Sequence, residues 1–136
     1  MMNRRMLSKE DEKEAGDEIE VRREDQDKIN RFSRLHQREL LMMDELKTLA
    51  KEREELDDIT TELELADEDE LVRYKIGDAF FHVALPVAQE MLGFSTSRVE
   101  EKLRQKEEKL EDIRAEMTEL KVDLYSRFGK TINLEV

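Results

Sequence analysis

The side chains in this sequence that could take part in chemistry are spaced in no reactive arrangement that we recognise. There are two histidines, His36 and His82, and no cysteine. Neither histidine follows a glutamate by three residues, which is the spacing that di-iron helix bundles use. Without cysteine, the chain can form no disulfide, no thiolate metal site and no thiol nucleophile. We therefore expect both histidines to be ordinary surface or interface residues.

The densest group of possible metal ligands is the segment ELELADEDE, residues 62–70, which carries six carboxylates in nine residues. An EF-hand calcium loop would need a glycine at its sixth position and a glutamate at its twelfth, and these are absent. We favour the alternative, a solvated loop in which mutual repulsion of the carboxylates ends the preceding helix. The sequence thus predicts no metal and no cofactor.

Motifs for nucleotide binding and nucleophilic catalysis are also missing. The sequence contains no P-loop, no dinucleotide fingerprint and no nucleophile elbow. Its many carboxylates lie on solvated helix faces, where they lack the burial that tunes a catalytic pKa. We predict that the chain is not an enzyme and has no ATP-driven cycle of its own.

The composition is typical of a coiled coil. Of the 136 residues, 44% are charged, 38% are hydrophobic and 5% are aromatic, so we expect one domain at most, without a large core. One proline and four glycines favour long helices that bury a narrow apolar stripe. The net charge of −12 repels nucleic acids and anionic membrane surfaces, so we expect neither as a partner.

Signals for crossing or entering a membrane are absent from the sequence. No apolar run approaches the roughly 18 residues that span a bilayer. The N-terminal stretch MMNRRMLSKEDEKEAGDEIE lacks the apolar centre of a signal peptide. We expect an intracellular protein that is located in the cytoplasm, with the nucleus left open as a second location.

Two long segments carry the apolar spacing of a coiled coil. The tail before them, residues 1–23, mixes charges without a period, and we predict that it is disordered. Residues 24–66 and 86–128 are predicted helices. The apolar side chains of the first are Leu35, Met42, Leu46, Leu49, Leu56, Ile59 and Leu63. Those of the second are Val99, Leu103, Leu110, Ile113, Met117, Leu120 and Leu124. Pro86 suits the first turn of the second helix, and Gly129 suits its C-terminal cap.

Charged residues interrupt both apolar stripes. The interruptions are Arg38, Glu45, Glu52 and Arg53 in the first helix and Lys106 in the second. A helix with so narrow a stripe needs a partner to be stable. Because the two helices are of similar length, we predict an antiparallel pair that has the chain ends at its tip and a β-hairpin at its base.

Residues 71–85 are typical of a β-hairpin. Two stretches rich in β-branched and aromatic residues flank Gly77-Asp78, a pair that suits a two-residue hairpin turn. This turn fixes the register of the strands. It places Val72, Tyr74, Ile76, Ala79, Phe81 and Val83 on one face. On the other face, Arg73 lies opposite His82 and Lys75 lies opposite Phe80.

A hairpin alone is marginally stable in water, and it leaves two unpaired edges. We predict that other chains supply neighbouring strands, so that the hairpin is an assembly element. The predicted interface residues are Val72, Tyr74, Ile76, Phe81 and Val83. The alternative is a hairpin that folds back on its own helices.

Apolar residues also gather at the predicted tip. Ile29 and Phe32 of the first helix would meet Tyr125 and Phe128 of the second, and Ile132 and Leu134 lie just beyond. Exposed apolar residues at a chain end indicate an interaction surface. The alternative is that they close the coiled coil internally, which we favour for Leu124 because it lies on the heptad.

The sequence resembles the β-type subunits of the eukaryotic prefoldin chaperone family over about residues 22–136. The resemblance rests on EDQDKINRF, ELELAD, YKIGDAF and LKVDLYSRFGKTINLE, which begin at residues 24, 62, 74 and 120. The last block is the most specific, because a heptad does not dictate its aromatic and glycine positions. Residues 1–20 match nothing in the family, and residues 82–98 are more variable.

The resemblance implies a mainly α fold over residues 24–136, which ends in a tail at 129–136. It implies a long antiparallel coiled coil with a single β-hairpin that assembles into an intersubunit β-barrel. The expected assembly is a hexamer of two α-type and four β-type subunits. Its tips would capture unfolded actin and tubulin and deliver them to the cytosolic chaperonin without ATP.

Ile29, Phe32, Tyr125 and Phe128 match the family's tip, and we add Ile132 and Leu134 as client-binding candidates. The leading hypothesis is therefore a chaperone subunit that holds clients by several weak apolar contacts. The alternative is a structural coiled-coil adaptor that oligomerises through its hairpin and binds a folded partner through a helix face.

Overall fold

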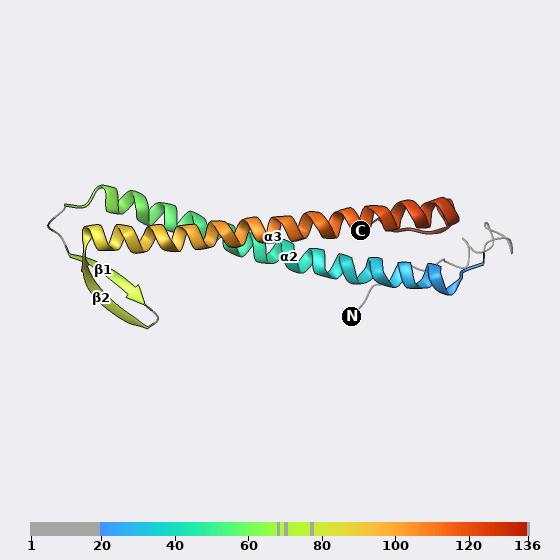
Figure 1. Ribbon diagram of the computed structural model, residues 1–136, viewed down its shortest axis with the longest axis horizontal. Helices are drawn as coiled ribbons and strands as arrows, with labels where there is room; N and C mark the ends of the chain where they lie inside the picture. Colours follow the sequence, from blue (N-terminus) through green and yellow to red (C-terminus); the bar gives the residue numbers. More distant parts are fainter. Residues whose placement is uncertain (1–19, 68, 70, 77, 136) are drawn as a thin grey trace. The chain divides into compact units, whose positions relative to one another are not determined.

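The structure, a computed structural model, describes residues 20–67, 69, 71–76 and 78–135, with residues 74–76 described by their backbone alone. It contains the helices α2 (Arg23–Glu64) and α3 (Leu85–Phe128), the strands β1 (Leu71–Ile76) and β2 (Ala79–Ala84), and the 3-10 turn η2 (Gly129–Thr131) (Figure 1). The mainly α fold with one small hairpin is confirmed, and the element bounds differ from the predicted ones by one or two residues. Of the predicted disordered tail, residues 1–19 lie outside the described residues, and Arg23 already begins α2.

The chain divides into two compact units. One unit, here called the terminal unit, combines the described residues up to Asp44 with those from Glu108 onward. The other, here called the hairpin unit, comprises Glu45–Glu107. Each unit thus contains a part of α2, a part of α3 and its own apolar core.

In the terminal unit, the beginning of α2 packs against the end of α3, as expected for antiparallel helices (Figure 1). The buried core residues are Ile29, Phe32, Leu35, Ile113, Met117, Leu124, Phe128, Ile132 and Leu134. Four of them belong to the apolar spacing identified in the sequence, namely Leu35, Ile113, Met117 and Leu124. Ile29 and Phe32 lie off that spacing and are buried as well.

In the hairpin unit, the end of α2 packs against the beginning of α3. The core consists of Leu63, Leu85, Ala88 and Leu92, and Val72 and Val83 of the hairpin pack against it. We call these four residues the hairpin-base cluster. β2 ends at Ala84 and α3 begins at Leu85, so the first buried residue of α3 follows the strand directly.

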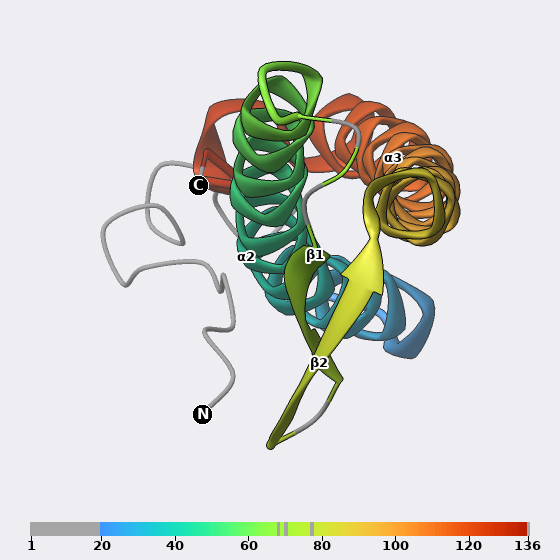
Figure 2. The ribbon, with the colours of Figure 1, turned by 90° about the vertical axis from the view of Figure 1, so that its left-hand side faces the viewer.

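The hairpin has the register that the turn predicted. The pairs of the antiparallel ladder are Leu71 with Ala84, Val72 with Val83, Arg73 with His82, Tyr74 with Phe81, Lys75 with Phe80 and Ile76 with Ala79. Within the described residues the sheet consists of these two strands. The hairpin projects away from the helices next to the beginning of α3 (Figure 2).

Three of the charged residues that interrupt the apolar stripes in the hairpin unit, Glu45, Arg53 and Lys106, form ion pairs between α2 and α3. Lys106 Nζ of α3 lies 2.8 Å from Glu45 Oε2 of α2. Arg53 Nη2 of α2 lies 2.8 Å from Glu100 Oε1 of α3. Such cross-helix pairs favour one register of the helix pair over shifted ones. Ile59, which we expected within the stripe, is instead 43% exposed.

One ion pair of the terminal unit has a bidentate geometry. Arg31 donates from Nε to Glu116 Oε1 and from Nη2 to Glu116 Oε2, with both distances 2.9 Å. The hydrogen bonds from Arg31 lower the pKa of the Glu116 carboxyl, and burial opposes this only in part. The same bonds raise the pKa of Arg31.

This pair predicts a pH-dependent contribution to stability. A carboxyl whose pKa is lower in the folded state stabilises fully above its unfolded pKa, and this contribution is lost as the pH falls through the folded pKa. Because both side chains are about 40% exposed, we expect Glu116→Gln to lower the free energy of unfolding at neutral pH by less than about 1 kcal/mol. Urea unfolding should show the difference from wild type at neutral pH and a smaller difference at about pH 3, below the usual carboxyl pKa.

The matched control is Glu119→Gln, which removes an exposed carboxylate from the same helix. It should have little effect at either pH. A destabilisation by Glu116→Gln that is as large in acid as at neutral pH would contradict the ionic origin of the effect.

Candidate functional site

The residues that the sequence singled out fall into two groups, one in each unit. The first group lies where α2 begins and α3 ends in the terminal unit, and the second lies on the hairpin. We call the first group the helix-end cluster. Its members are Ile29, Phe32, Leu124, Phe128, Ile132 and Leu134.

The helix-end cluster is buried. Phe32 and Leu134 have no exposed surface, and Ile132 is 4% exposed. Our expectation that these residues are exposed at the end of the coiled coil is therefore wrong for the described structure. They close the helix pair internally, as the alternative stated, and the physical reason is that the C-terminal segment covers them.

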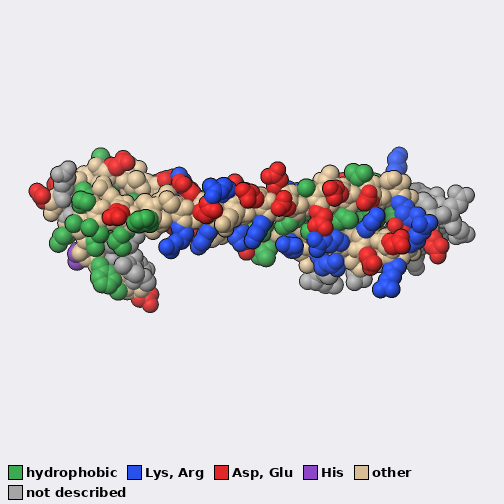
Figure 3. Space-filling view, viewed as in Figure 1, with side chains coloured by type: hydrophobic (Ala, Val, Ile, Leu, Met, Phe, Trp, Pro, Cys, Tyr) green, Lys and Arg blue, Asp and Glu red, His purple; other side chains and the backbone are tan. Residues whose placement is uncertain are grey.

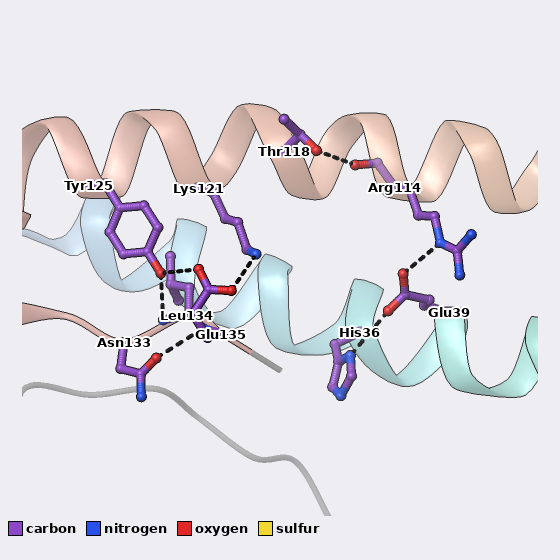
Figure 4. A network of polar contacts seen from close by, with 9 residues as sticks. All are labelled: His36, Glu39, Arg114, Thr118, Lys121, Tyr125, Asn133, Leu134 and Glu135. Atoms are coloured by element: carbon purple, nitrogen blue, oxygen red, sulfur yellow. Dashed lines mark hydrogen bonds and ion pairs between the residues drawn. The ribbon is translucent and has the colours of Figure 1, made fainter.

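The C-terminal segment, residues 129–135, turns back at the end of α3. Gly129 has a φ of +59°, a backbone conformation that a residue with a Cβ adopts only at a cost. Thr131 Oγ1 then donates to the carbonyl of Phe128 at 2.6 Å, and Ile132 is extended. From there the segment runs back beside α3 (Figures 1 and 4). Gly129 thus ends the helix as the sequence predicted.

A hydrogen-bond network around Tyr125 holds the end of this segment (Figure 4). The backbone N–H of Leu134 donates to the Tyr125 hydroxyl at 3.0 Å. The hydroxyl in turn donates to Glu135 Oε1 at 3.2 Å, and Lys121 Nζ lies 3.5 Å from Glu135 Oε2. Tyr125, a predicted tip residue, therefore contacts the chain's own C-terminal segment.

A second polar network joins the beginning of α2 to the end of α3. Asp25, in the first turn of α2, accepts a hydrogen bond from the backbone N–H of Arg22 at 3.0 Å, as the third residue of a capping box does. The same carboxylate oxygen accepts from Arg127 Nε at 2.6 Å. Asp25 is buried, so the ion pair satisfies a charge that would otherwise be costly to bury.

The hairpin is much more exposed than the helix-end cluster. Leu71 is 67% exposed, Phe80 is 50% exposed and Phe81 is 49% exposed. Val72 and Val83, on the same face as Phe81, are partly buried against the hairpin-base cluster. The alternative, a hairpin that folds back on its own helices, thus holds for the side chains of Val72 and Val83. It does not hold for Phe80 and Phe81, which stay half exposed. The side chains of Tyr74 and Ile76 lie outside the described residues.

Sequence reasoning missed several exposed apolar residues. In the hairpin unit these are Leu65, Val87 and Phe94, and in the terminal unit they are Leu40, Leu41 and Val122. Figure 3 shows hydrophobic side chains gathered over the hairpin and over the parts of the helices next to it. Phe94 could have been found, because it is an aromatic residue off the heptad spacing and next to Gly93 in the sequence. An aromatic there contributes nothing to the apolar stripe.

The opposite face of the hairpin carries a cation–π contact. The guanidinium carbon of Arg73 lies 3.9 Å from the centre of the Phe80 ring. Such a contact at an exposed site contributes about 0.5–1 kcal/mol, and it orients the ring while leaving half of its surface exposed. The two faces of the hairpin therefore present different chemistry, an apolar face around Phe81 and a cationic-aromatic face around Phe80.

The histidines have surroundings that fit ordinary structural roles. His36 Nδ1 lies 3.4 Å from Glu39 Oε1, and Arg114 Nε donates to Glu39 Oε2 at 2.9 Å (Figure 4). His82 is exposed on β2. Within the described part of the chain, no group of three or more histidine, cysteine or carboxylate side chains could hold a metal ion. In the same part, no helix is long and apolar enough to span a membrane.

A groove of the hairpin unit lies between α2 and α3, with a volume of about 350 Å³. Its lining includes Asp57, Glu64 and Glu100 together with Gly93 and Thr96. These carboxylates lie at an open groove and belong to exposed residues. The groove therefore lacks the enclosed, mostly apolar lining of a small-molecule site.

Comparisons with known proteins agree on one family. The family model described as prefoldin subunit matches residues 26–131. Prefoldin subunit 4 of Saccharomyces cerevisiae is 42% identical over 112 residues, covering 82% of this chain and 87% of the relative. Prefoldin subunit 4 of Homo sapiens is 36% identical over 124 residues, covering 90% and 92%. A probable prefoldin subunit 4 of Drosophila melanogaster is 38% identical over 119 residues, covering 88% and 86%.

Burial of the helix-end cluster makes a prediction about stability. Phe32 has no exposed surface, so Phe32→Ala should lower the free energy of unfolding by about 3–5 kcal/mol through lost burial and the cavity left behind. Leu40, on the same helix, is 53% exposed, and Leu40→Ala should change stability by no more than about 0.5 kcal/mol. Urea unfolding followed by circular dichroism at one protein concentration measures both. Equal, small effects of the two substitutions would show that Phe32 is not in a packed core.

Proposed function

The chain belongs to the prefoldin subunit family, and on this basis we propose that it is a β-type subunit of a hexameric, ATP-independent co-chaperone. Prefoldin subunits are non-catalytic chaperone components that assemble with one another, so the chain is not an enzyme. What we propose beyond this is the type of subunit, the way in which it assembles, and the clients and chaperonin that it serves.

The observation that carries the proposal is the exposed hairpin. Exposed apolar side chains gathered on one element indicate an interaction surface. Phe81 is 49% exposed on the hairpin face that carries Val72 and Val83, and Leu71 and Phe80 are exposed on the opposite face. The outer edges of β1 and β2 also have backbone groups that further strands could pair with. Strands from other subunits would satisfy both the apolar face and the edges.

The proposed assembly is a β-barrel shared between subunits in a hexamer of two α-type and four β-type chains. The family resemblance assigns one hairpin to the β-type, and one hairpin is what the described residues contain. The interface residues that we propose are Val72, Tyr74, Ile76, Phe81 and Val83. Val72 and Val83 would connect the barrel to the helices, because they already pack against the hairpin-base cluster.

The proposed mechanism is multivalent holding of unfolded polypeptide, notably actin and tubulin, for delivery to the cytosolic chaperonin. Several weak apolar sites on one platform raise the effective concentration of each site, so that strong holding needs no deep pocket. The client-binding candidates are Ile29, Phe32, Tyr125, Phe128, Ile132 and Leu134. Because most of them are buried, client contact requires that the helix-end cluster open. The proposed location is the cytoplasm.

The assembly step can be tested by adding a charge to the hairpin. We predict that Phe81→Asp, coexpressed with the other prefoldin subunits, fails to enter the hexamer or enters it at less than about a tenth of the wild-type level, because a carboxylate in an apolar interface core is costly to bury. Copurification followed by native mass spectrometry measures incorporation. Circular dichroism of the isolated variant should show unchanged helix content, since Phe81 is half exposed.

The matched control is Val122→Asp, which places the same charge on an exposed apolar residue of the terminal unit. It should enter the hexamer normally. If Phe81→Asp assembles as well as the control, the hairpin is not the assembly surface. Binding of a folded partner that depends on exposed helix residues, with no capture of unfolded actin, would favour a coiled-coil adaptor instead.

A further inference from the structure

The C-terminal segment lies against the terminal unit in the manner of a bound peptide. It belongs to neither helix, Ile132 has an extended backbone conformation, and the segment runs back beside α3 (Figure 4). Ile132 and Leu134 are buried, whereas Asn133 and Glu135 between and after them are exposed. This alternation is what an extended chain shows when one of its faces fills a groove.

The terminal unit contacts the segment through the segment's side chains and through its backbone. Ile132 and Leu134 join the core that contains Ile29, Phe32 and Phe128. The Tyr125 hydroxyl accepts a hydrogen bond from the backbone N–H of Leu134 at 3.0 Å. This contact does not depend on which side chain is present at position 134. Grooves that bind extended peptides combine backbone hydrogen bonds with pockets for alternate side chains in this way.

The end of the segment adds a charge contact. Glu135 accepts from the Tyr125 hydroxyl at 3.2 Å and lies 3.5 Å from Lys121 Nζ. The Glu135 side chain is 75% exposed, so this contact is weaker than burial of the two aliphatic side chains. The groove is therefore suited to two aliphatic residues separated by one residue and followed by a carboxylate.

Of the six client-binding candidates, Ile29, Phe32, Tyr125 and Phe128 pack in the cluster that the segment joins, and the other two belong to the segment itself. With the segment seated, Phe32 and Phe128 have almost no exposed surface, and an unfolded client could not reach them. With the segment displaced, the same apolar groove would be open to any extended chain with a similar pattern. The turn at Gly129, with its positive φ, is the point about which the segment would move.

We propose that the segment from Thr131 to Glu135 is a tethered ligand of its own subunit, which occupies the client groove until a client displaces it. The clients that this groove takes are extended segments with aliphatic side chains at alternate positions, preferably followed by an acidic residue. This inference rests on the proposed function, because it concerns the groove through which the subunit would hold a client.

Tethering explains how so short a segment could compete with clients. A segment linked to its groove by a few residues has an effective concentration on the order of millimolar. The apparent affinity for an added ligand falls by the fraction of grooves that are open, so a groove that is open about a tenth of the time binds tenfold more weakly. The segment would thus exclude weak, folded-protein contacts while allowing multivalent clients to bind.

The test uses the full-length chain assembled with the other prefoldin subunits, as wild type and as Leu134→Ser. The probe is a fluorescent peptide with the sequence of residues 129–136, GKTINLEV. We expect the peptide to bind the Leu134→Ser complex with a Kd at least about tenfold lower than for wild type, as measured by fluorescence anisotropy. The reason is that the variant's own segment no longer fills the groove. Unfolded actin should displace the peptide, and the variant should bind actin more tightly than wild type does.

Two matched controls and one variant with an intermediate expected effect accompany this test. Asn133→Ser changes an exposed residue of the same segment and should behave as wild type. A peptide in which the residue matching Leu134 is serine should not bind the Leu134→Ser complex. Tyr125→Phe removes the hydroxyl but keeps the ring, and it should give a smaller gain in peptide binding than Leu134→Ser.

The outcomes separate the two proposals. If the peptide binds the Leu134→Ser and wild-type complexes equally, or binds neither, the segment is an ordinary part of the core and this inference is overturned. If the peptide binds as expected but neither complex captures unfolded actin, the groove exists and the proposed holding of actin fails. If actin is captured and Leu134→Ser weakens capture, the segment supports the client site and does not compete for it.

Discussion

The structure depends on the antiparallel packing of α2 against α3 within each unit. Neither helix has an apolar stripe broad enough to be stable in isolation, because charged residues interrupt both stripes. Some of the interruptions pair across the helices in the hairpin unit, as Glu45 does with Lys106, and Arg31 and Glu116 pair across the helices in the terminal unit. Apolar burial stabilises the pair, and these ion pairs favour one register of the two helices.

The two units differ in whether apolar residues outside the helix seam are covered or exposed. In the terminal unit, the C-terminal segment covers Phe32 and Phe128, so the apolar surface is closed within the chain. In the hairpin unit, Phe80 and Phe81 stay half exposed, on opposite faces of the hairpin. The chain therefore covers the helix-end cluster with a short segment of its own and leaves apolar residues of the hairpin exposed, where we propose that other subunits bind.

Much of this fold follows from local sequence rules. The heptad spacing predicted both helices, because it states which side of each helix is buried. The acidic run after the first helix, Pro86 and Gly129 then placed three helix ends to within two residues. The two-residue turn predicted five of the six strand pairs, and the sixth, Leu71 with Ala84, continues the same register. Gly129 was expected to end α3, since helices commonly end at a glycine with positive φ.

The burial of the helix-end cluster could not be predicted in the same way. Ile132 and Leu134 lie beyond both helices, and no helical period relates them to Phe32, which is about a hundred residues earlier in the chain. The exposure of Ile59 has a similar cause, since the residue fits the spacing but the helix partner does not cover it. Contacts of this kind depend on three-dimensional packing and not on periodicity.

Hydrogen exchange followed by mass spectrometry, on the chain alone and within the assembled hexamer, tests the account most directly. The account predicts that residues 71–84 exchange fast in the isolated chain and become protected on assembly. It also predicts that residues 24–35 and 124–135 are protected in both states, because the C-terminal segment closes that end within the chain. A hairpin whose protection does not change on assembly, or a C-terminal segment that exchanges as fast as an unfolded peptide, would contradict it.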